Sequence, residues 1–561
     1  MKQILFFFLS FSTLIPLVEA QEVENITRFH SSREGIYFRD VKKFGEYRYG
    51  IFEGGEKDSL FNNGVFITID TSKKGSVTFI KMNDKHEVLF SGVFHDPKET
   101  FNYLKRIYYH DGVVYFNLYS WGDLWYNGEL IEKRSLNENT YGPILVGVDE
   151  VTNKVVFVKG LDQNFFSGPE AIAFYGDRIY IGGTVNGNTS PDGHYIGLPD
   201  PETGVKGGYL LVYDLNTGEV VNSTTWGMWG YNSIADMKVD SKGNIIVLAA
   251  TQSHIHQIGN DSTIQLPSDY ANSIIQKYDP NGELIGIYTF GNTDISNVTF
   301  HTEITILPDD RIAIFGLTYG YVKTENGDSI AMVGRRGCDI SVLSEDLEME
   351  WIDYYSYVPV ESNNWLYQSD IASDMDGNIY ITFGFFKPNF LESRHGEVLP
   401  RGYYFIKYNN SGQVLKQKMV QNHVHGTMIM DLIEVDKLLV CHFEPAGDYN
   451  EFLKISQKYR QETYLFELNM DKLTSSIEDE VGENIEVTRI YPNPIEKDDI
   501  LNISTQVDEE YMIYDVMGRI HGCGYSSGGK ISLIDHQLRA GVYIMKFGRN
   551  SKDSVRFIVQ D

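Results

Sequence analysis

Apolar positions recur along the chain in a pattern that predicts pairs of β-hairpins. The first hairpin of each pair is an apolar strand, a turn of Gly, Asp or Asn, and a second apolar strand, with an alternation of period two. A second hairpin of the same kind follows, so each repeat amounts to four short strands in roughly 65 residues. The first hairpin is clearest at 171–181, 234–247, 304–314 and 371–381, with looser copies at 103–117 and 428–440, and the second at 210–220, 275–284 and 405–414.

Four-stranded units repeated at a fixed period are typical of solenoids, arrays and propellers. Segments that would form crossover helices are missing, which favours a radial β-propeller. Six units run from about Tyr103 to Leu473, and a degenerate seventh is predicted from 48–55 and 65–70. We therefore expect an all-β fold, a β-propeller of about seven four-stranded blades, with six or eight blades as open alternatives. Two β-sandwiches, the competing interpretation, do not explain so even a period.

The repeats resemble the β-propeller repeat family of exported bacterial proteins, whose units follow the patterns D-x-x-G-N-I-Y-x-x-G and F-x-x-K-Y-x-x-x-G. The segment 374–380 with Gly384 carries the first pattern, and the pairs 277–278 and 407–408 carry the second. These motifs concern turn chemistry and strand packing, so the resemblance implies a fold and leaves activity open.

Composition and charge narrow the classes of function. The chain has 561 residues, which suggests two or three domains, and its 37 Tyr and 52 Gly suit strands and tight turns. The formal net charge of −29 argues against nucleic acid or an anionic membrane surface as partner, and is compatible with cationic partners, metal ions and neutral sugars. Three widely spaced cysteines do not make a disulfide framework.

The N-terminus has the pattern of a secretory signal peptide. Lys2 precedes an apolar run over 4–18, and Val18 and Ala20 are small residues where a signal peptidase reads the chain. We predict cleavage after Ala20, and no later segment is long and apolar enough to cross a bilayer. The predicted domains are a signal peptide over 1–20, a β-propeller over 21–473, a polar linker over 474–486 and a small β-sandwich over 487–561.

The C-terminal segment carries motifs in a specific order. It closely resembles the sorting domain of the type IX secretion system of Bacteroidetes, which reads YPNP, a strand, YD-x-x-G-R, L-x-x-G-x-Y and a last strand. The resemblance implies that the type IX machinery is a partner and that the protein is secreted or displayed on the outer cell surface. The motif residues are Tyr491, Pro492, Asn493, Pro494, Tyr514, Asp515, Gly518, Arg519, Leu538, Gly541 and Tyr543.

Four carboxylates share one position of consecutive repeats, at the start of the predicted innermost strand. Facing one axis, they would repel one another unless solvated or bridged by cations. This favours either a site for a divalent cation, with calcium as the candidate, or acids that cap strand amides or face channel water. The register fails at Lys105 and Ile429. The four residues are Glu170, Asp236, Glu303 and Asp370.

Two His-x-His pairs, His254/His256 and His423/His425, place imidazoles on one face of a strand, and His301 lies beside Glu303. Such pairs suit a metal, although no third ligand or general base can be assigned, and a structural or solvent-facing role is the alternative. No cofactor other than a cation is indicated.

Aromatic residues crowd several predicted loops and are candidates for binding a glycan or a peptide. Packing between blades would explain them equally well. The insertion over 186–208 is expected to decorate one face of the propeller. The candidate ligand-binding residues are Trp121, Trp125, Trp226, Trp229 and Trp365.

Motifs for phosphate loops, nucleophile elbows and zinc proteases are missing from the sequence. The leading hypothesis is a non-enzymatic secreted or surface protein whose propeller binds a glycan or a protein. The alternative is an extracellular enzyme that degrades polysaccharide or peptide at an axial site, and a purely structural surface component stays open.

Overall fold

Every regular element that the described residues form is a β-strand. The chain divides into two compact units, Met1–Ser475 and Ser476–Asp561. No helix in the described part of the chain has the length and apolar character to cross a membrane. The computed structural model describes residues 23–29, 37–54, 59–62, 65–68, 76–95, 103–120, 122–133, 142–160, 167–185, 207–226, 232–251, 255–258, 262–265, 272–290, 298–323, 329–358, 366–395, 398–421, 428–444, 449–450, 455–456, 462–472, 490–491, 495–496, 500–503, 510–515, 520–525, 530–533, 536, 538–539, 541–547 and 554–560.

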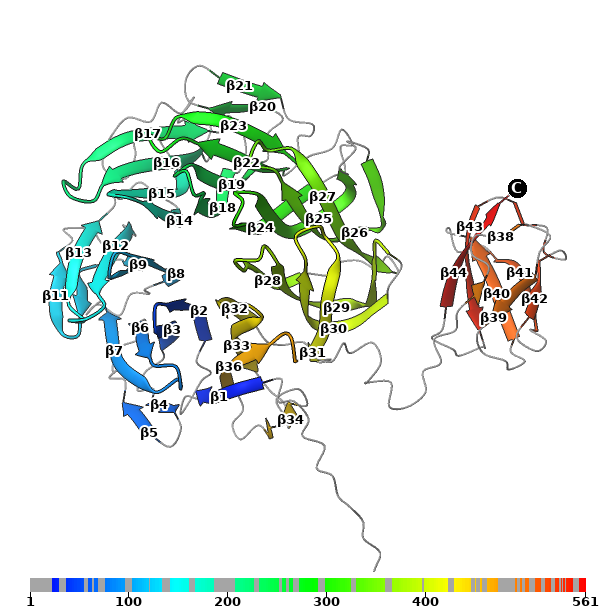
Figure 1. The fold of residues 1–561 in the computed structure, drawn as a ribbon, viewed down its shortest axis with the longest axis horizontal. Helices are drawn as coiled ribbons and strands as arrows, with labels where there is room; N and C mark the ends of the chain where they lie inside the picture. Colours follow the sequence, from blue (N-terminus) through cyan, green and yellow to red (C-terminus); the bar gives the residue numbers. More distant parts are fainter. Residues whose placement is uncertain are drawn as a thin grey trace, which may run out of the picture. The chain divides into compact units, whose positions relative to one another are not determined.

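The first unit is a ring of seven four-stranded antiparallel blades (Figure 1). The predicted all-β propeller is thus confirmed. From the inner to the outer strand, blade 1 consists of β2 (Tyr37–Phe44), β3 (Tyr47–Gly54), β6 (Ser76–Met82) and β7 (Val88–His95), and blade 2 of β8 (Tyr103–His110), β9 (Val113–Ser120), β12 (Gly142–Asp149) and β13 (Val155–Gly160). In the same order, blade 3 consists of β14 (Ser167–Tyr175), β15 (Arg178–Val185), β16 (Gly207–Asp214) and β17 (Val220–Trp226), and blade 4 of β18 (Asn232–Val239), β19 (Ile245–Thr251), β22 (Asn272–Tyr278) and β23 (Leu284–Thr289). Blade 5 consists of β24 (Val298–Ile306), β25 (Ile312–Lys323), β26 (Ser329–Leu343) and β27 (Met349–Val358), and blade 6 of β28 (Leu366–Ser373), β29 (Ile379–Ser393), β30 (Val398–Tyr408) and β31 (Val414–Gln421).

Blade 7 closes the ring with a strand from the other end of the chain. Its inner three strands are β32 (Met428–Glu434), β33 (Lys437–Glu444) and β36 (Glu462–Asn469), and its outer strand is β1 (Val23–Phe29). The seam with blade 1 holds a buried ion cluster around Glu467. The Glu467 carboxylate lies 2.7 Å from an Arg48 Nη of blade 1 and 2.7 Å from the Lys437 Nζ of its own blade.

One part of the predicted blade 1 is wrong. The segment predicted over 65–70 contributes β5 (Val65–Thr68), which among the described strands pairs with β4 (Ser59–Asn62) in a two-stranded hairpin outside the blade. The inner strand of this blade is β2, which the apolar pattern did not predict because Asp40, Lys42 and Lys43 interrupt it. A similar small hairpin, β34 (Tyr449–Asn450) with β35 (Ile455–Ser456), stands apart from blade 7.

The repeat motif is explained by hydrogen bonds in the turn. Asp374 Oδ1 accepts the backbone N–H groups of Asp376 and Asn378, and its Oδ2 accepts the Asn378 amide and the Tyr380 hydroxyl. Gly377 has a φ of +79°, which favours glycine. Asp240 makes the same backbone bonds in blade 4. The motif therefore serves the hairpin turn.

We expect Asp374→Ala to lower the free energy of unfolding by about 2–3 kcal/mol, because it removes an almost fully buried acceptor that takes one buried and three part-buried hydrogen bonds. Urea denaturation followed by tryptophan fluorescence measures the change. Asp376→Ala, at an exposed position two residues away, is the matched control and should change stability by less than about 0.5 kcal/mol. Equal effects of the two substitutions would contradict this account of the motif.

The outer strands of the blades are protected from edge-to-edge pairing in two ways. Blades 1, 3 and 5 each pair their outer strand with a strand supplied by the next blade. In addition, each outer strand of blades 1 to 6 carries a one-residue bulge at its second position, and bulges disrupt edge pairing. The added strands are β10 (Leu124–Tyr126) with β11 (Glu129–Glu132) on β7, β20 (Ile255–Ile258) with β21 (Ser262–Gln265) on β17, and the second half of β29 on β27. The bulged residues are Leu89, Val156, Val221, Ile285, Glu350 and Leu415.

The second unit is a small β-sandwich. One core cluster joins Ile531 of one sheet to Ile513 and Met545 of the other, so the two sheets share one hydrophobic core. The three-stranded sheet is β37 (Ile490–Tyr491), β39 (Ile500–Ile503) and β42 (Lys530–Ser532), and the five-stranded sheet is β38 (Ile495–Glu496), β44 (Ser554–Gln560), β43 (Gly541–Phe547), β40 (Glu510–Asp515) and β41 (Ile520–Tyr525).

A charged chamber on the propeller axis as candidate functional site

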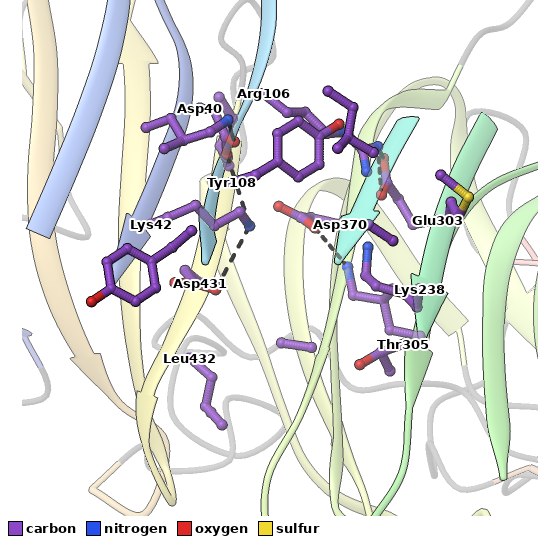
Figure 2. Close-up of a pocket in the computed structure, with 18 of the residues that line it drawn as sticks. Asp40, Lys42, Arg106, Tyr108, Lys238, Glu303, Thr305, Asp370, Asp431 and Leu432 are labelled. Carbon is purple, nitrogen blue, oxygen red and sulfur yellow. Dashed lines mark hydrogen bonds and ion pairs between the residues drawn. The ribbon is translucent and has the colours of Figure 1, made fainter. Parts of the chain in front are cut away.

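All seven inner strands line one cavity of about 710 Å³ on the propeller axis (Figure 2). Its volume lies within the range of small-molecule sites. Charged side chains enter it from several blades: Lys42, Arg106, Lys238, Glu303, Asp370 and Asp431 are drawn in the figure. The chamber therefore brings together charged residues that are far apart in the sequence.

Arg106 crosses the chamber from blade 2 to blades 4 and 5. One Nη lies 2.5 Å from Asp236 Oδ1, and the other lies 2.7 Å from Glu303 Oε1. The Lys238 ammonium also contacts Asp236, at 2.7 Å, and its side chain is 40% exposed. A guanidinium shared by two carboxylates fixes three blades relative to one another.

The two carboxylates that Arg106 joins differ in acidity. Burial raises the pKa of Asp236, but Arg106 and Lys238 outweigh burial and lower that pKa to about 2. Burial raises the pKa of Glu303 above its usual range against the effect of Arg106, and the neighbouring carboxylates of Asp236 and Asp370 raise it further. Asp236 thus stays ionised to a lower pH than Glu303 does.

On the other side of the chamber Lys42 lies between two acids. Its Nζ is 3.6 Å from Asp431 Oδ1 and 3.8 Å from Asp40 Oδ1. Burial raises the pKa of Asp40 to about 6, with Lys42 opposing it. Figure 2 shows Asp370 between this group and the side that holds Lys238 and Glu303.

Several of these acids bind backbone N–H groups of the next blade. Asp40 accepts the Ile107 N–H at 2.8 Å, Asp236 accepts the Ile304 N–H at 3.2 Å, and Asp370 accepts the Met430 N–H at 3.0 Å. The same position on three blades therefore carries a carboxylate that ties the inner strand of one blade to that of the following blade.

Of the four predicted carboxylates, Glu303 and Asp370 line the chamber, and Asp236 is buried beside it in contact with Arg106. The side chain of Glu170 lies outside the described residues. Blade 2 presents Arg106 to the chamber, next to the Lys105 of the predicted register. In the described part of the chain no group of three or more His, Cys, Asp or Glu side chains is arranged to hold a metal ion, and a calcium site stays a prediction.

One side of the chamber is aromatic. Phe44 and Tyr109 stack with ring centroids 5.0 Å apart, and Phe174 stacks on His110 at 5.0 Å. Phe44, Tyr109 and Phe174 all line the chamber, from three consecutive blades. The sequence pattern did not single out these rings, nor Asp40, Lys42, Arg106 and Lys238. The charged residues could have been found from one signal, because they interrupt inner strands that are otherwise apolar.

Two of the five candidate tryptophans, Trp125 and Trp226, lie in the described part of the chain. Trp226 is 1% exposed and packs near Tyr278, so its assignment to ligand binding is corrected: it is a core residue between blades 3 and 4. Trp125 is half-buried in β10 beside His95, and neither of these tryptophans lines the chamber. Trp121, Trp229 and Trp365 lie outside the described residues, as does most of the insertion over 186–208.

Among the candidate histidines only His301 can be assigned contacts. Its Nε2 lies 3.0 Å from Asp339 inside blade 5, where Ser341 and Thr318 also bind that carboxylate. His301 is therefore part of a buried network within the blade. The side chains of both His-x-His pairs lie outside the described residues.

The sorting motif supplies part of the core of the second unit. Leu538 and Tyr543 are buried in its core cluster. The Tyr543 hydroxyl accepts the Arg539 N–H and donates to the Arg539 carbonyl, closing the turn before β43. Tyr514 and Asp515 end β40, Tyr491 lies in β37 and Gly541 begins β43. Pro492, Asn493, Pro494, Gly518 and Arg519 lie outside the described residues.

The fold and these motifs define a seven-bladed propeller that carries a C-terminal sorting domain. Residues 489–560 match the family model described as secretion system C-terminal sorting domain, which confirms the prediction. The protein is thus exported by the type IX secretion system, to the cell surface or as a secreted protein. No curated protein matches the chain.

Solved structures give weak likenesses. A protein of unknown function from Bacteroides caccae is 9% identical, with 54% of this chain and 79% of that chain covered and a TM-score of 0.28. A protein of unknown function from Dyadobacter fermentans is 11% identical over 64% and 92%, with a TM-score of 0.32. A europium-containing methanol dehydrogenase is 11% identical over 79% and 94%, with a TM-score of 0.36. At these scores the likeness carries no argument about function.

Proposed function

We propose that this exported protein is a binding protein whose axial chamber holds a neutral, hydroxyl-rich ligand such as a sugar unit of a glycan. The observation that carries the proposal is the chamber of about 710 Å³ with aromatic rings on one side and charged donors and acceptors on the other. Aromatic faces stack on the apolar faces of sugars, and the paired charges offer hydrogen bonds to hydroxyl groups.

The pairing of charges in the chamber favours a neutral ligand over an ionic one. Arg106 is engaged by Asp236 and Glu303, and Lys42 by Asp431 and Asp40. A strongly charged ligand would have to displace these partners, whereas a hydroxyl group can add to them. The net charge of −29 also disfavours polyanionic glycans.

A hydrolase with an axial site is the second candidate. Two neighbouring carboxylates whose pKa values are shifted in opposite directions suit a general acid and its partner, and Asp236 and Glu303 differ in this way. Their common contact with Arg106 counts against the assignment, because a general acid must be free to reach the substrate.

Screening the purified protein against neutral oligosaccharides, followed by calorimetric titration, tests the binding role. We expect saturable binding of at least one neutral glycan and a loss of about tenfold in affinity for Phe174→Ala, because the substitution removes a stacking surface in the chamber. Tyr175→Ala is the matched control: this neighbouring ring is 41% exposed and does not line the chamber.

Two results would argue against the binding role. If no glycan binds, or if the two substitutions weaken binding equally, the chamber is not the glycan site. If the bound glycan is cleaved, as measured by new reducing ends, and Glu303→Gln stops the cleavage, the hydrolase is the better assignment.

The predicted domain boundaries are proposed as well. A signal peptide over 1–20 is compatible with a propeller whose first strand begins at Val23. A linker over 474–486 agrees with the division between the compact units at 475/476 and with a family match that begins at 489.

A further inference from the structure

A second cavity, of about 350 Å³, lies at the outer rim between blades 5 and 6. It is lined by β27, by the end of β29 and by the start of β31. The second half of β29 leaves its own blade and pairs with the outer strand of blade 5, with Tyr355 opposite Ser393 and Val358 opposite Phe390. The cavity is therefore bounded by an arm that one blade extends onto its neighbour.

Asp353 is a buried carboxylate in the wall of this cavity. It is 2% exposed, its Oδ1 accepts the Tyr354 N–H at 2.9 Å, and its Oδ2 accepts the Tyr408 hydroxyl at 3.1 Å. The Tyr355 and Tyr408 hydroxyl oxygens are 2.7 Å apart. Since Tyr408 gives its only proton to Asp353, Tyr355 must donate to Tyr408, and the Tyr355 oxygen can then only accept further hydrogen bonds.

The two hydrogen bonds described above for Asp353 come from neutral donors, a peptide N–H and a phenol. Burial raises the pKa of this carboxyl, and the nearby His395 and Arg394 lower it by less. A desolvated carboxylate that accepts two hydrogen bonds has room for further donors, and a charged donor stabilises it more than a neutral one does. The cavity thus offers a buried carboxylate as a strong acceptor.

The rest of the lining limits the size and character of a ligand. Ser393, His395 and Gln413 are polar, whereas Val414 and Leu415 are aliphatic. We propose that this cavity is a binding site for a compact aliphatic amine, whose ammonium group hydrogen-bonds to the Asp353 carboxylate and the Tyr355 oxygen while its short chain packs against Val414 and Leu415. This site is separate from the axial chamber and does not depend on the function proposed for it.

Titration of the full-length protein with n-butylamine and with 1-butanol, which has a similar size without the charge, tests the proposal by calorimetry and thermal shift. We expect saturable binding of butylammonium and at least tenfold weaker binding of butanol. Asp353→Asn should weaken butylammonium binding about tenfold or more. Asp346→Asn, at an exposed turn of the same blade, should leave it unchanged.

Leu415→Trp keeps the test decisive if Asp353→Asn fails to fold. Leu415 is 45% exposed as a bulge residue, so a larger side chain is tolerated there while it fills the mouth of the cavity. This variant should abolish butylammonium binding and leave the melting temperature within a few degrees of the wild type. Equal binding of amine and alcohol, no saturable amine binding, or amine binding that survives Leu415→Trp would overturn the proposal.

Discussion

Glu467→Gln is expected to lower the free energy of unfolding by about 3 kcal/mol at neutral pH. The Glu467 carboxylate has no exposed surface and contacts Arg48 and Lys437 at 2.7 Å each. An uncharged amide would leave both cations inside the seam without their anionic partner, which is the costly way to break a buried ion pair. Because the seam joins the first and last blades, we expect the whole ring to lose stability. Urea denaturation of the full-length protein measures the difference.

The pH dependence gives an independent check on this ion cluster. Burial raises the pKa of Glu467, but hydrogen bonds from His86, Lys437 and Arg48 lower it far more, so its folded-state pKa lies below the usual value of 4.5. A depressed carboxyl pKa stabilises the fold above the unfolded pKa, and this contribution is lost as the pH falls below it. The difference in free energy of unfolding between wild type and Glu467→Gln should therefore have its largest value at pH 7 and decrease below pH 4.5.

The matched control is Glu345→Gln. Glu345 forms an ion pair with Lys242 at the surface, where both side chains are about half exposed, and such pairs contribute less than about 1 kcal/mol. Two results would show that the seam does not depend on an ionised Glu467. The first is a loss of unfolding free energy for Glu467→Gln equal to that for Glu345→Gln, and the second is a loss that stays constant from pH 7 to pH 3.

The propeller could be predicted because its repeats carry their own turn chemistry. Asp374 and Gly377 indicate a tight turn in the sequence, and the structure uses them in that way. The closing strand β1 could not be predicted, because its partner β36 lies more than four hundred residues away and no local pattern encodes that pairing. The inner strand of blade 1 was missed for a related reason: half of its residues are charged, and partners of these charges lie on neighbouring blades, Asp431 for Lys42 and the Ile107 N–H for Asp40.

The candidate site could likewise be predicted only in part, because its contacts join blades that are far apart in the sequence. The equal spacing of Asp236, Glu303 and Asp370 placed them correctly on inner strands, but spacing says nothing of a partner from another blade. Arg106 reaches Asp236 and Glu303 across the chamber, and the spacing of the acids gave no indication of this contact. The apolar pattern also could not show which aliphatic residues of the outer strands are exposed. Leu89 and Val156 look like core positions until the bulge turns them to solvent.

Deleting residues 476–561 is expected to abolish export while the propeller still folds. The family match and the motif residues lie in this unit, and the propeller is a separate compact unit with its own cores. Immunoblots of medium, cell surface and periplasm of the producing bacterium measure the outcome. We expect the extracellular and surface fractions to fall to background and the truncated chain to accumulate in the periplasm in a protease-resistant form.

A single substitution tests whether the secretion machinery recognises the folded sorting domain or only a short linear segment of it. Tyr543 is buried in the sandwich core and closes the turn at Arg539, so Tyr543→Ala should cost about 3–5 kcal/mol. A unit of this size has little more stability than that in total, and we expect Tyr543→Ala to reduce export nearly as much as the deletion. Lys530→Ala, at an exposed position of β42, should be exported normally. Normal export of Tyr543→Ala would mean that the machinery reads a short linear segment, and normal export of the deletion variant would mean that the signal lies in the propeller.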